Sequence, residues 1–297
     1  MYKIRLCENF RAVFYAPFYA TVALGFAARE NVEVTIVESA TPGAGTAALL
    51  DGSADVTWGG PMRVMKARDE AGPPIMCFCE VVRRDPFYLL ARSGIDHVAL
   101  ADLPRLKMAS VSEVPTPWLC LQHDLREAGI DPVTIPRIPD RTMGENVEAL
   151  ARGEIDVAQM FEPFASIAER RGIGRIVHAA SARGETSYTT LLATRDGIQR
   201  NREAVAALVR AARQMQVWLD KATADDLVAA VADFYPQVEQ RDLVTAFRRY
   251  KAAQLWSSGG TDVSRAGFAR LSASLQSGGF IVRQPAYEDC VADALLR

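Results

Sequence analysis

Two stretches of this chain follow the same pattern, and that duplication limits the folds it can adopt. "LLDGSADVTWGGP" covers residues 49–61, and "LARGEIDVAQMFEP" covers residues 150–163. Four letters of the first stretch, L, G, D and V, recur in the second, each 101 positions later. In both stretches an apolar run ends at a glycine, Gly52 or Gly153, and Asp-Val follows. The pattern is typical of a helix that ends at glycine and is followed by a strand.

Further segments extend the correspondence along each half. In the first half, a strand-like run at residues 2–8 is followed by a helical run at 16–30 and a strand-like run at 32–38. In the second half, the corresponding runs are residues 105–113, 115–129 and 132–139. Each half therefore has the order strand, helix, strand, helix, strand, which predicts a parallel sheet covered by helices. The expected fold class is α/β, with two lobes of βαβαβ type.

The segments outside the two halves predict how the lobes are joined. Two strands follow the first half and one follows the second, so we expect the chain to cross between the lobes near residues 90–95 and 185–190. From Asn201 onward the pattern is helical. We expect residues 1–92 with 189–297 to form the first lobe, with the helical tail packed on it, and residues 93–188 to form the second.

Charge and hydropathy exclude several functions. The formal net charge is −2, which provides no basic patch for nucleic acid or an anionic membrane. No run of about 18 apolar residues occurs, so we expect no membrane insertion. His97, His123 and His178 form no metal-binding pattern. We therefore expect neither a metal nor another cofactor.

The N-terminus and the cysteines suggest a compartment. "MYKIRLCE" reads as a strand, without the basic and apolar regions of a leader. The five cysteines are odd in number and scattered, as free thiols in a reducing compartment would be. We expect a cytoplasmic protein, or a periplasmic one if a leader has been removed.

Several stretches together resemble a known family. They are "FYAPFYATVALGFAARENVEVTIVE", "GTAALLDGSADVTWGGP", "DPFYLLAR", "LARGEIDVAQMFEP" and the helical tail. In order and spacing they resemble the type II periplasmic-binding-protein fold, and more narrowly the sulfonate-binding and thiamine-pyrimidine-related branch of ABC-transporter solute-binding proteins. The resemblance implies two lobes that close by hinge motion on a small molecule, and an ABC-transporter permease as a partner if the protein is exported.

Ligands of open α/β sheets lie outside the carboxyl ends of the strands, so the residues there are the candidate site. Those of the first lobe are Phe10, Arg11, Tyr15, Thr41, Trp58, Gly59 and Arg63. Those at the second lobe and its crossover are Ser112, Glu113, Thr116, Phe161, Glu162 and Tyr188. Several also have a structural interpretation: the aromatic residues could be core, Thr41 and Glu162 could cap helices, and Arg11 could be a solvated charge.

The candidate charges leave the sign of the ligand open. Arginine suits a carboxylate or sulfonate, because its guanidinium makes paired hydrogen bonds to such groups. An acidic side chain, such as Glu162 at a pocket mouth, suits an amine or amidine. The main hypothesis is a binder of an aromatic, sulfonate or pyrimidine-like organic molecule, of unknown charge.

The alternative is an intracellular enzyme on the same fold, of desulfinase, decarboxylase or lyase type. Fungal thiamine-pyrimidine synthases resemble this fold and carry a Lys and a His after the third strand, where this chain has Gly59 and Arg63. Hydroxybiphenyl sulfinate desulfinases carry a nucleophilic Cys at the end of the first strand, where this chain has Cys7. Their partner His is missing here, and a thiol without a base or a nearby cation is a poor nucleophile.

Overall fold

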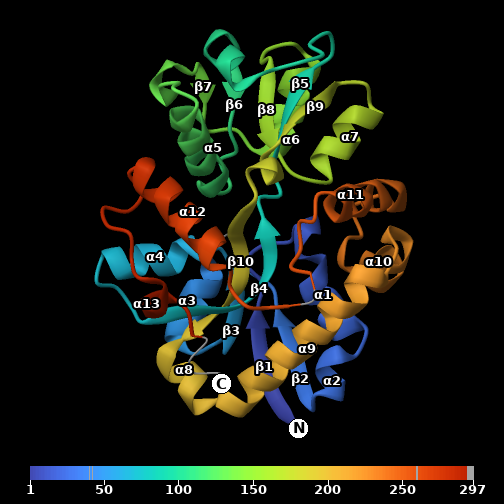
Figure 1. Ribbon diagram of the computed structural model, residues 1–297. Coiled ribbons are helices and arrows are strands. Elements are labelled where there is room, and N and C mark those ends of the chain that lie inside the picture. Colours follow the sequence, from blue (N-terminus) through green and yellow to red (C-terminus); the bar gives the residue numbers. More distant parts are fainter. Residues whose placement is uncertain (40, 42, 259, 293–297) are drawn as a thin grey trace.

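The computed structural model describes residues 1–39, 41, 43–258 and 260–292, and its strands form two five-stranded sheets (Figure 1). We call each sheet with its covering helices a lobe. Residues 293–297 of the predicted first lobe lie outside the described residues. The predicted α/β fold with two lobes is confirmed.

The first sheet has the order β2-β1-β3-β10-β4. Its parallel part is β1 (Tyr2–Cys7), β2 (Val32–Val37) and β3 (Val56–Gly59). Cys7 at the end of β1 pairs with Val37 and with Thr57, so the three strands end at one edge of the sheet. The helices α1 (Ala16–Ala23), α2 (Phe26–Arg29), α3 (Ala44–Asp51) and α4 (Met62–Asp69) belong to this lobe.

The second sheet repeats this arrangement in the order β7-β6-β8-β5-β9. Its strands are β5 (Tyr88–Arg92), β6 (Met108–Ala109), β7 (Arg137–Ile138), β8 (Val157–Met160) and β9 (Gly174–Ala179), and its helices are α5 (Thr116–Glu127), α6 (Met143–Ala151) and α7 (Phe164–Arg170). The duplicated stretches end α3 and α6 and lead into β3 and β8, as predicted. Gly52 and Gly153 have φ of 78° and 67°, the left-handed region that glycine enters without steric cost.

Two local expectations differ from the structure. The strand expected at 132–139 is a 3-10 turn, Pro132–Thr134, followed by the two-residue strand β7. The Asp131 carboxylate accepts a hydrogen bond from the Val133 amide (3.1 Å), and neither Pro132 nor Pro136 has an amide hydrogen for a strand ladder. In addition, β5 pairs in the second sheet, although the predicted division placed residues 1–92 in the first lobe. The lobe boundaries stay a prediction.

The chain crosses between the sheets twice, after β4 (Ile75–Arg84) and before β10 (Glu185–Thr194), which pair antiparallel. Arg183, in the 3-10 turn Ala180–Arg183, joins the two crossovers. Its buried guanidinium donates to Asp85 on the other crossover (2.5 Å) and, through Nε, to Asp124 of α5 (2.9 Å). Because a buried charge is costly without a partner, these contacts hold both crossovers and α5 together.

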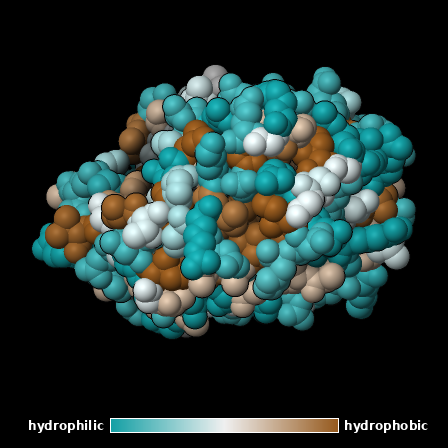
Figure 2. All heavy atoms as spheres, turned by 90° about the horizontal axis from the view of Figure 1, so that it is seen from above, coloured by the Kyte–Doolittle hydropathy of each residue, from teal (hydrophilic) through white to brown (hydrophobic). Residues whose placement is uncertain are grey.

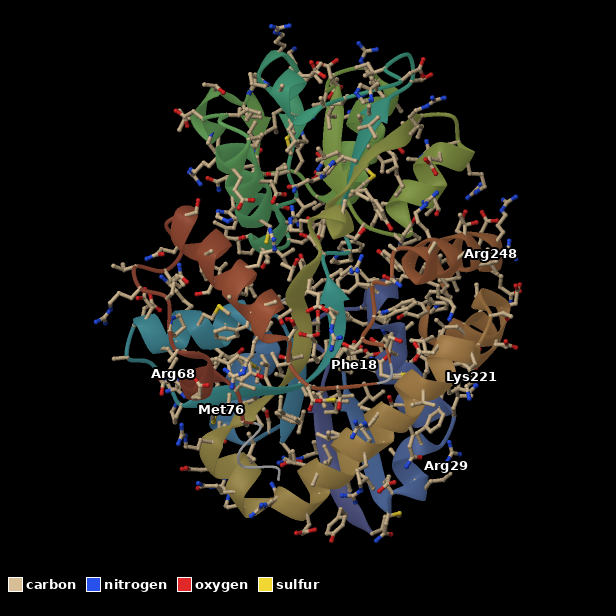
Figure 3. The ribbon with its side chains drawn as sticks, viewed as in Figure 1. Phe18, Arg29, Arg68, Met76, Lys221 and Arg248 are labelled. Atoms are coloured by element: carbon tan, nitrogen blue, oxygen red, sulfur yellow. The ribbon has the colours of Figure 1, made fainter. Side chains whose placement is uncertain are left out.

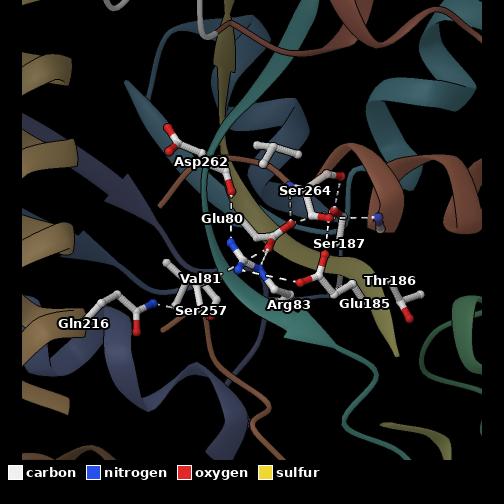
Figure 4. A network of polar contacts seen from close by, with 12 residues as sticks. Glu80, Val81, Arg83, Glu185, Thr186, Ser187, Gln216, Ser257, Asp262 and Ser264 are labelled. Carbon is white, nitrogen blue, oxygen red and sulfur yellow. Dashed lines mark hydrogen bonds and ion pairs between the residues drawn. The ribbon is translucent and has the colours of Figure 1, made fainter. Parts of the chain in front are cut away.

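A buried network fixes β4 and β10 just below the crossovers (Figure 4). Glu80 of β4 accepts hydrogen bonds from Arg83 Nε (2.5 Å), from Ser187 Oγ of β10 (2.6 Å) and from the Ser264 amide of the tail (3.1 Å). Cys79 and Ser187 have φ of 52° and 45°, and the pairing shifts register there. The network therefore stabilises an irregular part of the two crossing strands.

The tail helices are α8 (Arg195–Arg200), α9 (Arg202–Lys221), α10 (Ala224–Val231), α11 (Gln240–Ala252), α12 (Arg265–Ser277) and α13 (Tyr287–Cys290). They pack on the first lobe: α9 crosses α1 and α2, α10 packs on α1, and α12 lies along β10 (Figure 1). Two of them also reach the second lobe, because α11 contacts α7 and α12 contacts α5.

The views with side chains agree with a buried core and a polar exterior. Phe18 lies inside the first lobe, whereas Arg29 and Arg248 lie at its outer edge (Figure 3). The end formed by the second lobe is mainly hydrophilic, with hydrophobic residues in separate patches (Figure 2). None of the described helices has both the length and the apolar character needed to cross a bilayer.

The contact of α12 with β10 predicts an effect of adding one methyl group. A Cβ on Gly267 of α12 would lie 2.7 Å from the Ser187 backbone nitrogen, closer than real Cβ atoms approach. We expect Gly267→Ala to lower the free energy of unfolding by about 1–3 kcal/mol, through overpacking. Gly144→Ala is the matched control, since nothing lies within 4 Å of its added Cβ near the start of α6. Equal urea midpoints for both variants would contradict the packing described.

Candidate functional site

A small cavity lies where the carboxyl ends of the two sets of parallel strands face each other. Its volume is about 30 Å³, room for one or two water molecules. It is lined by Asn9, Phe10, Phe14, Tyr15, Gly60, Met62, Arg63, Phe87, Val114, Thr116 and Tyr188. These residues come from both lobes and, through Phe87, from the first crossover, so motion of one lobe against the other changes the cavity directly. We call it the interlobe pocket.

A larger hollow in the second lobe has a different construction. Its volume is about 510 Å³, and it surrounds Arg92 and Arg175. Its residues come from that lobe alone, and its arginines are paired with Asp156 (2.9 Å) and Asp96 (3.1 Å). It therefore offers neither hinge-dependent closure nor an available charge.

Aromatic rings form the upper part of the pocket and bridge the lobes. Phe10 and Phe14 of the first lobe meet Phe161, which follows β8, with ring centroids 6.2 and 5.1 Å apart. Phe87 on one crossover meets Phe161 edge-on at 5.1 Å. Such pairs stabilise beyond their buried area. The two lobes thus close through an apolar, aromatic contact.

A polar group of three residues forms the floor. Asn9, just after β1, accepts hydrogen bonds from the Gly43 amide (2.9 Å) and from Arg63 Nη2 (3.4 Å), while its Nδ2 donates to the Tyr15 hydroxyl (3.5 Å). Burial raises the pKa of Tyr15 to about 12, so its phenol stays protonated at neutral pH. Arg63 makes no ion pair with a carboxylate in the described part of the chain.

The second lobe and β10 contribute the remaining polar groups. Thr116 begins α5, and its hydroxyl contacts Met62 Sδ across the pocket (2.6 Å). The Tyr188 side chain is buried, yet its hydroxyl has no hydrogen-bond partner among the residues described. A buried hydroxyl without a partner costs free energy, and native proteins keep few such groups.

The sequence-predicted residues separate into two groups. The structure brings Phe10, Tyr15, Arg63, Thr116 and Tyr188 together around the pocket, with Phe161 packed behind its rings. Trp58 is fully buried, stacked on Phe18 at 4.8 Å, and lies outside the lining. Gly59 ends β3 beside Arg63, and an added Cβ there would lie 3.3 Å from Leu192 and 3.7 Å from Arg63 Nε.

The other predicted charges are paired within the protein. Arg11 pairs with Glu8 (3.1 Å) and Glu38 (2.9 Å). Glu162 is fully buried and pairs with Arg249 of α11, and its carboxylate accepts a hydrogen bond from the Ser166 amide (2.9 Å). Burial raises the pKa of Glu162, against the opposing effect of Arg249.

Three more predicted residues lie outside the lining. Glu113 accepts a hydrogen bond from the Met143 amide at the start of α6 (2.9 Å), while its other oxygen has no partner among the described residues. Ser112 is exposed, with its amide bonded to the Arg141 carbonyl. Thr41 is exposed, and its backbone carbonyl rather than its side chain contacts the start of α3.

Six lining residues did not appear among the predicted site residues: Asn9, Phe14, Gly60, Met62, Phe87 and Val114. Asn9 had a usable signal, because it directly follows the first strand. Gly60 had one too, since it follows β3. For Phe87 and Val114 the signal is three-dimensional: they lie near the pocket only because the crossover and the loop before α5 turn toward the first lobe.

The environment of Cys7 is that of a buried thiol. It is 3% exposed, and Sγ lies 3.5 Å from the Glu8 carbonyl oxygen. Burial, with a smaller contribution from Glu8, raises the pKa of Cys7. Both effects oppose the thiolate that a nucleophile needs. No cluster of three or more possible metal ligands occurs among the described residues either.

Comparison with protein families identifies the group. A family model described as NMT1/THI5 like matches residues 13–219, more than half of the chain. The chain belongs to the NMT1/THI5-like family. The matched range includes the interlobe pocket apart from Asn9 and Phe10.

Relatives of this NMT1/THI5-like protein carry names that refer to binding. YtlA of Bacillus subtilis (strain 168), provisionally named a binding protein, is 25% identical over 258 residues, which are 86% of this chain and 77% of YtlA. The Staphylococcus aureus ligand-binding component of an ABC-type import system, solved with zinc, has a TM-score of 0.79 at 15% identity, covering 100% of this chain and 98% of its own. The periplasmic aliphatic sulphonate binding protein SsuA of Escherichia coli has a TM-score of 0.76 at 16% identity, covering 100% and 99%. These likenesses confirm the bilobal fold.

The raised pKa of Cys7 predicts slow alkylation. Because the thiolate is the reacting form, a pKa above the ordinary value lowers its fraction at every pH below that pKa. We expect iodoacetamide at neutral pH to label Cys7 far more slowly in the native protein than in denaturant, as measured by peptide mass spectrometry. Fast, selective labelling of native Cys7, blocked by an aromatic sulfinate, would favour the enzyme alternative.

Proposed function

We propose that this protein is a solute-binding protein, which binds a small organic molecule in the interlobe pocket and closes its two lobes over it. The observation that carries the proposal is the lining of the pocket, which combines residues from both lobes with Phe87 of the first crossover. Such a pocket couples ligand contact to hinge motion, because the ligand completes contacts that only the closed arrangement makes.

The comparisons support a role in import. Similar structures are named as a sulphonate-binding protein and as a component of an ABC-type import system. We extend that role to this chain: its partner is an ABC-transporter permease, and it acts outside the cytoplasmic membrane, where an importer collects its solute. The buried Cys7 with its raised pKa gives no support to a covalent mechanism.

The contacts between the lobes support reversible closure. On one side of the pocket, Arg170 of α7 makes two hydrogen bonds to Asp242 of α11 (2.9 and 2.8 Å). On the other side, Arg126 of α5 donates to Ser277 of α12 (3.0 Å). These polar contacts suit an interface that opens to water, while Leu119 and Cys120 of α5 pack against α12 in a buried apolar cluster.

A ligand screen tests the function. Small anionic, neutral and cationic solutes are compared by thermal shift, and small-angle X-ray scattering follows lobe closure. A true ligand at about 100 times its Kd stabilises the folded state by about 2.7 kcal/mol and reduces the radius of gyration. Chemical turnover of a stabilising compound, detected by mass spectrometry, would replace this proposal with the enzyme alternative.

Filling the pocket tests its location. Val114 lines the pocket from the second lobe, so we expect Val114→Trp to hold the lobes apart, increase the radius of gyration and abolish ligand binding. Val133→Trp is the matched control, because Val133 lies in the same lobe with 86% of its surface exposed. If Val114→Trp binds as well as Val133→Trp does, the ligand site lies elsewhere.

Breaking one interlobe ion pair tests the hinge. We expect Arg170→Gln to shift the unliganded protein toward an open arrangement, because Asp242 loses its partner on the closed interface. The apparent affinity then falls in proportion to the fraction of closed molecules. Arg171→Gln is the control, since the neighbouring Arg171 pairs with Glu148 inside the second lobe (2.7 Å). Scattering profiles that change equally in both variants would contradict the assignment of Arg170 to the closed state.

A further inference from the structure

Arg63 is the only charged side chain among the described residues that line the interlobe pocket. It is partly buried, and its one hydrogen bond in the described part of the chain is to Asn9 Oδ1, at 3.4 Å. Burial lowers the pKa of Arg63, which is the effect of removing a cation from water without supplying an anion. The neighbouring Tyr15 is protonated at neutral pH and does not neutralise it.

The backbone around Arg63 is shaped to hold the guanidinium in place. An added Cβ on Gly43 would lie 2.9 Å from Arg63 Nη1, so the glycine leaves room for the group. Gly43 has φ of 97°, and its amide is held by the same Asn9 side chain that contacts Arg63. The Arg63 guanidinium is therefore positioned by neighbouring parts of the first lobe, unlike the guanidinium of a flexible surface arginine.

No carboxylate is among the described residues that line the pocket, and two of the three carboxylates in the neighbouring loops are paired with arginine. Glu8 pairs with Arg11 and accepts a hydrogen bond from Tyr19 (2.5 Å). Glu162 pairs with Arg249. Glu113 accepts from the amide of Met143 with one oxygen, and its other oxygen has no partner among the described residues. The one charge on the described lining is positive, and α5, which begins at Thr116, adds the positive end of its helix dipole.

We propose that the ligand is a small organic oxyanion, a carboxylate or a sulfonate, whose charged group binds Arg63. The inference rests on the proposed function and fixes the sign of the ligand charge. The Tyr188 hydroxyl, buried and without a partner in the described residues, donates the second hydrogen bond, and Thr116 contacts the oxyanion from the second lobe. Phe10, Phe14 and Phe87 surround the apolar body of the ligand.

Matched probes test the charge requirement by calorimetry. Acetate, methanesulfonate, benzoate and benzenesulfonate are compared with acetamide, benzamide and benzylamine, and the difference between carboxylates and sulfonates identifies the oxyanion. We expect the wild-type protein to bind anions and to reject the neutral and cationic probes. Arg63→Gln should weaken anion binding by about 10- to 100-fold, the loss typical of a charged hydrogen bond. Arg63→Lys should retain part of the affinity, since it keeps the charge without the paired donors.

The stability of the unliganded variants separates a binding role from a structural one. Arg63→Gln removes an uncompensated cation, so we expect its melting temperature to equal or exceed that of the wild type while anion-induced stabilisation is lost. Tyr188→Phe should behave in the same way and provides a second variant if Arg63→Gln folds poorly. Arg210→Gln is the control, because Arg210 pairs with Glu30 on the surface (2.7 Å) and lies outside the pocket.

The possible results of these experiments distinguish the oxyanion proposal from the proposed binding function. Binding of benzamide or benzylamine in preference to the anions, lost in Val114→Trp, overturns the oxyanion assignment and leaves the binding function standing. Anion binding that Arg63→Gln and Tyr188→Phe leave unchanged overturns the assignment of these residues. Failure of the wild-type protein to bind any probe or any member of the wider screen overturns both.

Discussion

The arrangement of the molecule depends on the buried ion pairs of Arg183. Its guanidinium lies between Asp85 on one crossover and Asp124 on α5. The side chains of Arg183 and Asp85 have almost no exposure to solvent. Two charges of opposite sign at this depth stabilise one geometry strongly, since moving either partner away leaves a charge buried without compensation. The two crossing segments are therefore fixed to each other, and the strand ends of both lobes face the same pocket.

Below that junction, the contacts within the first lobe differ in kind from the contacts between the two lobes. The Glu80 network binds β4, β10 and the tail into one unit, although the strands are irregular there. Between the lobes the contacts are mixed: aromatic edges around Phe161, buried apolar packing of α5 on α12, and ion pairs such as Arg170 with the buried Asp242. A buried network with all its partners present resists separation, so β4, β10 and the tail stay one unit in the proposed hinge motion.

The sequence predicted the architecture well and the chemistry of the site less well. Repeated helix ends and strand starts are local patterns, so the duplicated stretches predicted two similar lobes and located the strand ends. Pairing of charges is a long-range property. Arg11 and Glu38 are 27 positions apart, and Glu162 and Arg249 are 87 positions apart. No local pattern shows that these charges are paired with each other, or that Arg63 is left without a carboxylate partner. For the same reason, the sequence alone left the charge of the ligand undecided.

The position of β10 also bears on the order in which the chain acquires its structure during synthesis. β10 lies between β3 and β4 in the first sheet, yet it is made only after the whole of the second sheet, whose strands run from Tyr88 to Ala179. During synthesis on a ribosome, β4 therefore lacks its neighbour β10 until late. The second sheet, in contrast, is encoded in one continuous segment, and all its strands become available together. The lobe that begins first is completed last, and until Glu185–Thr194 emerges its exposed strand edges are the part of the nascent chain most open to aggregation and to chaperones.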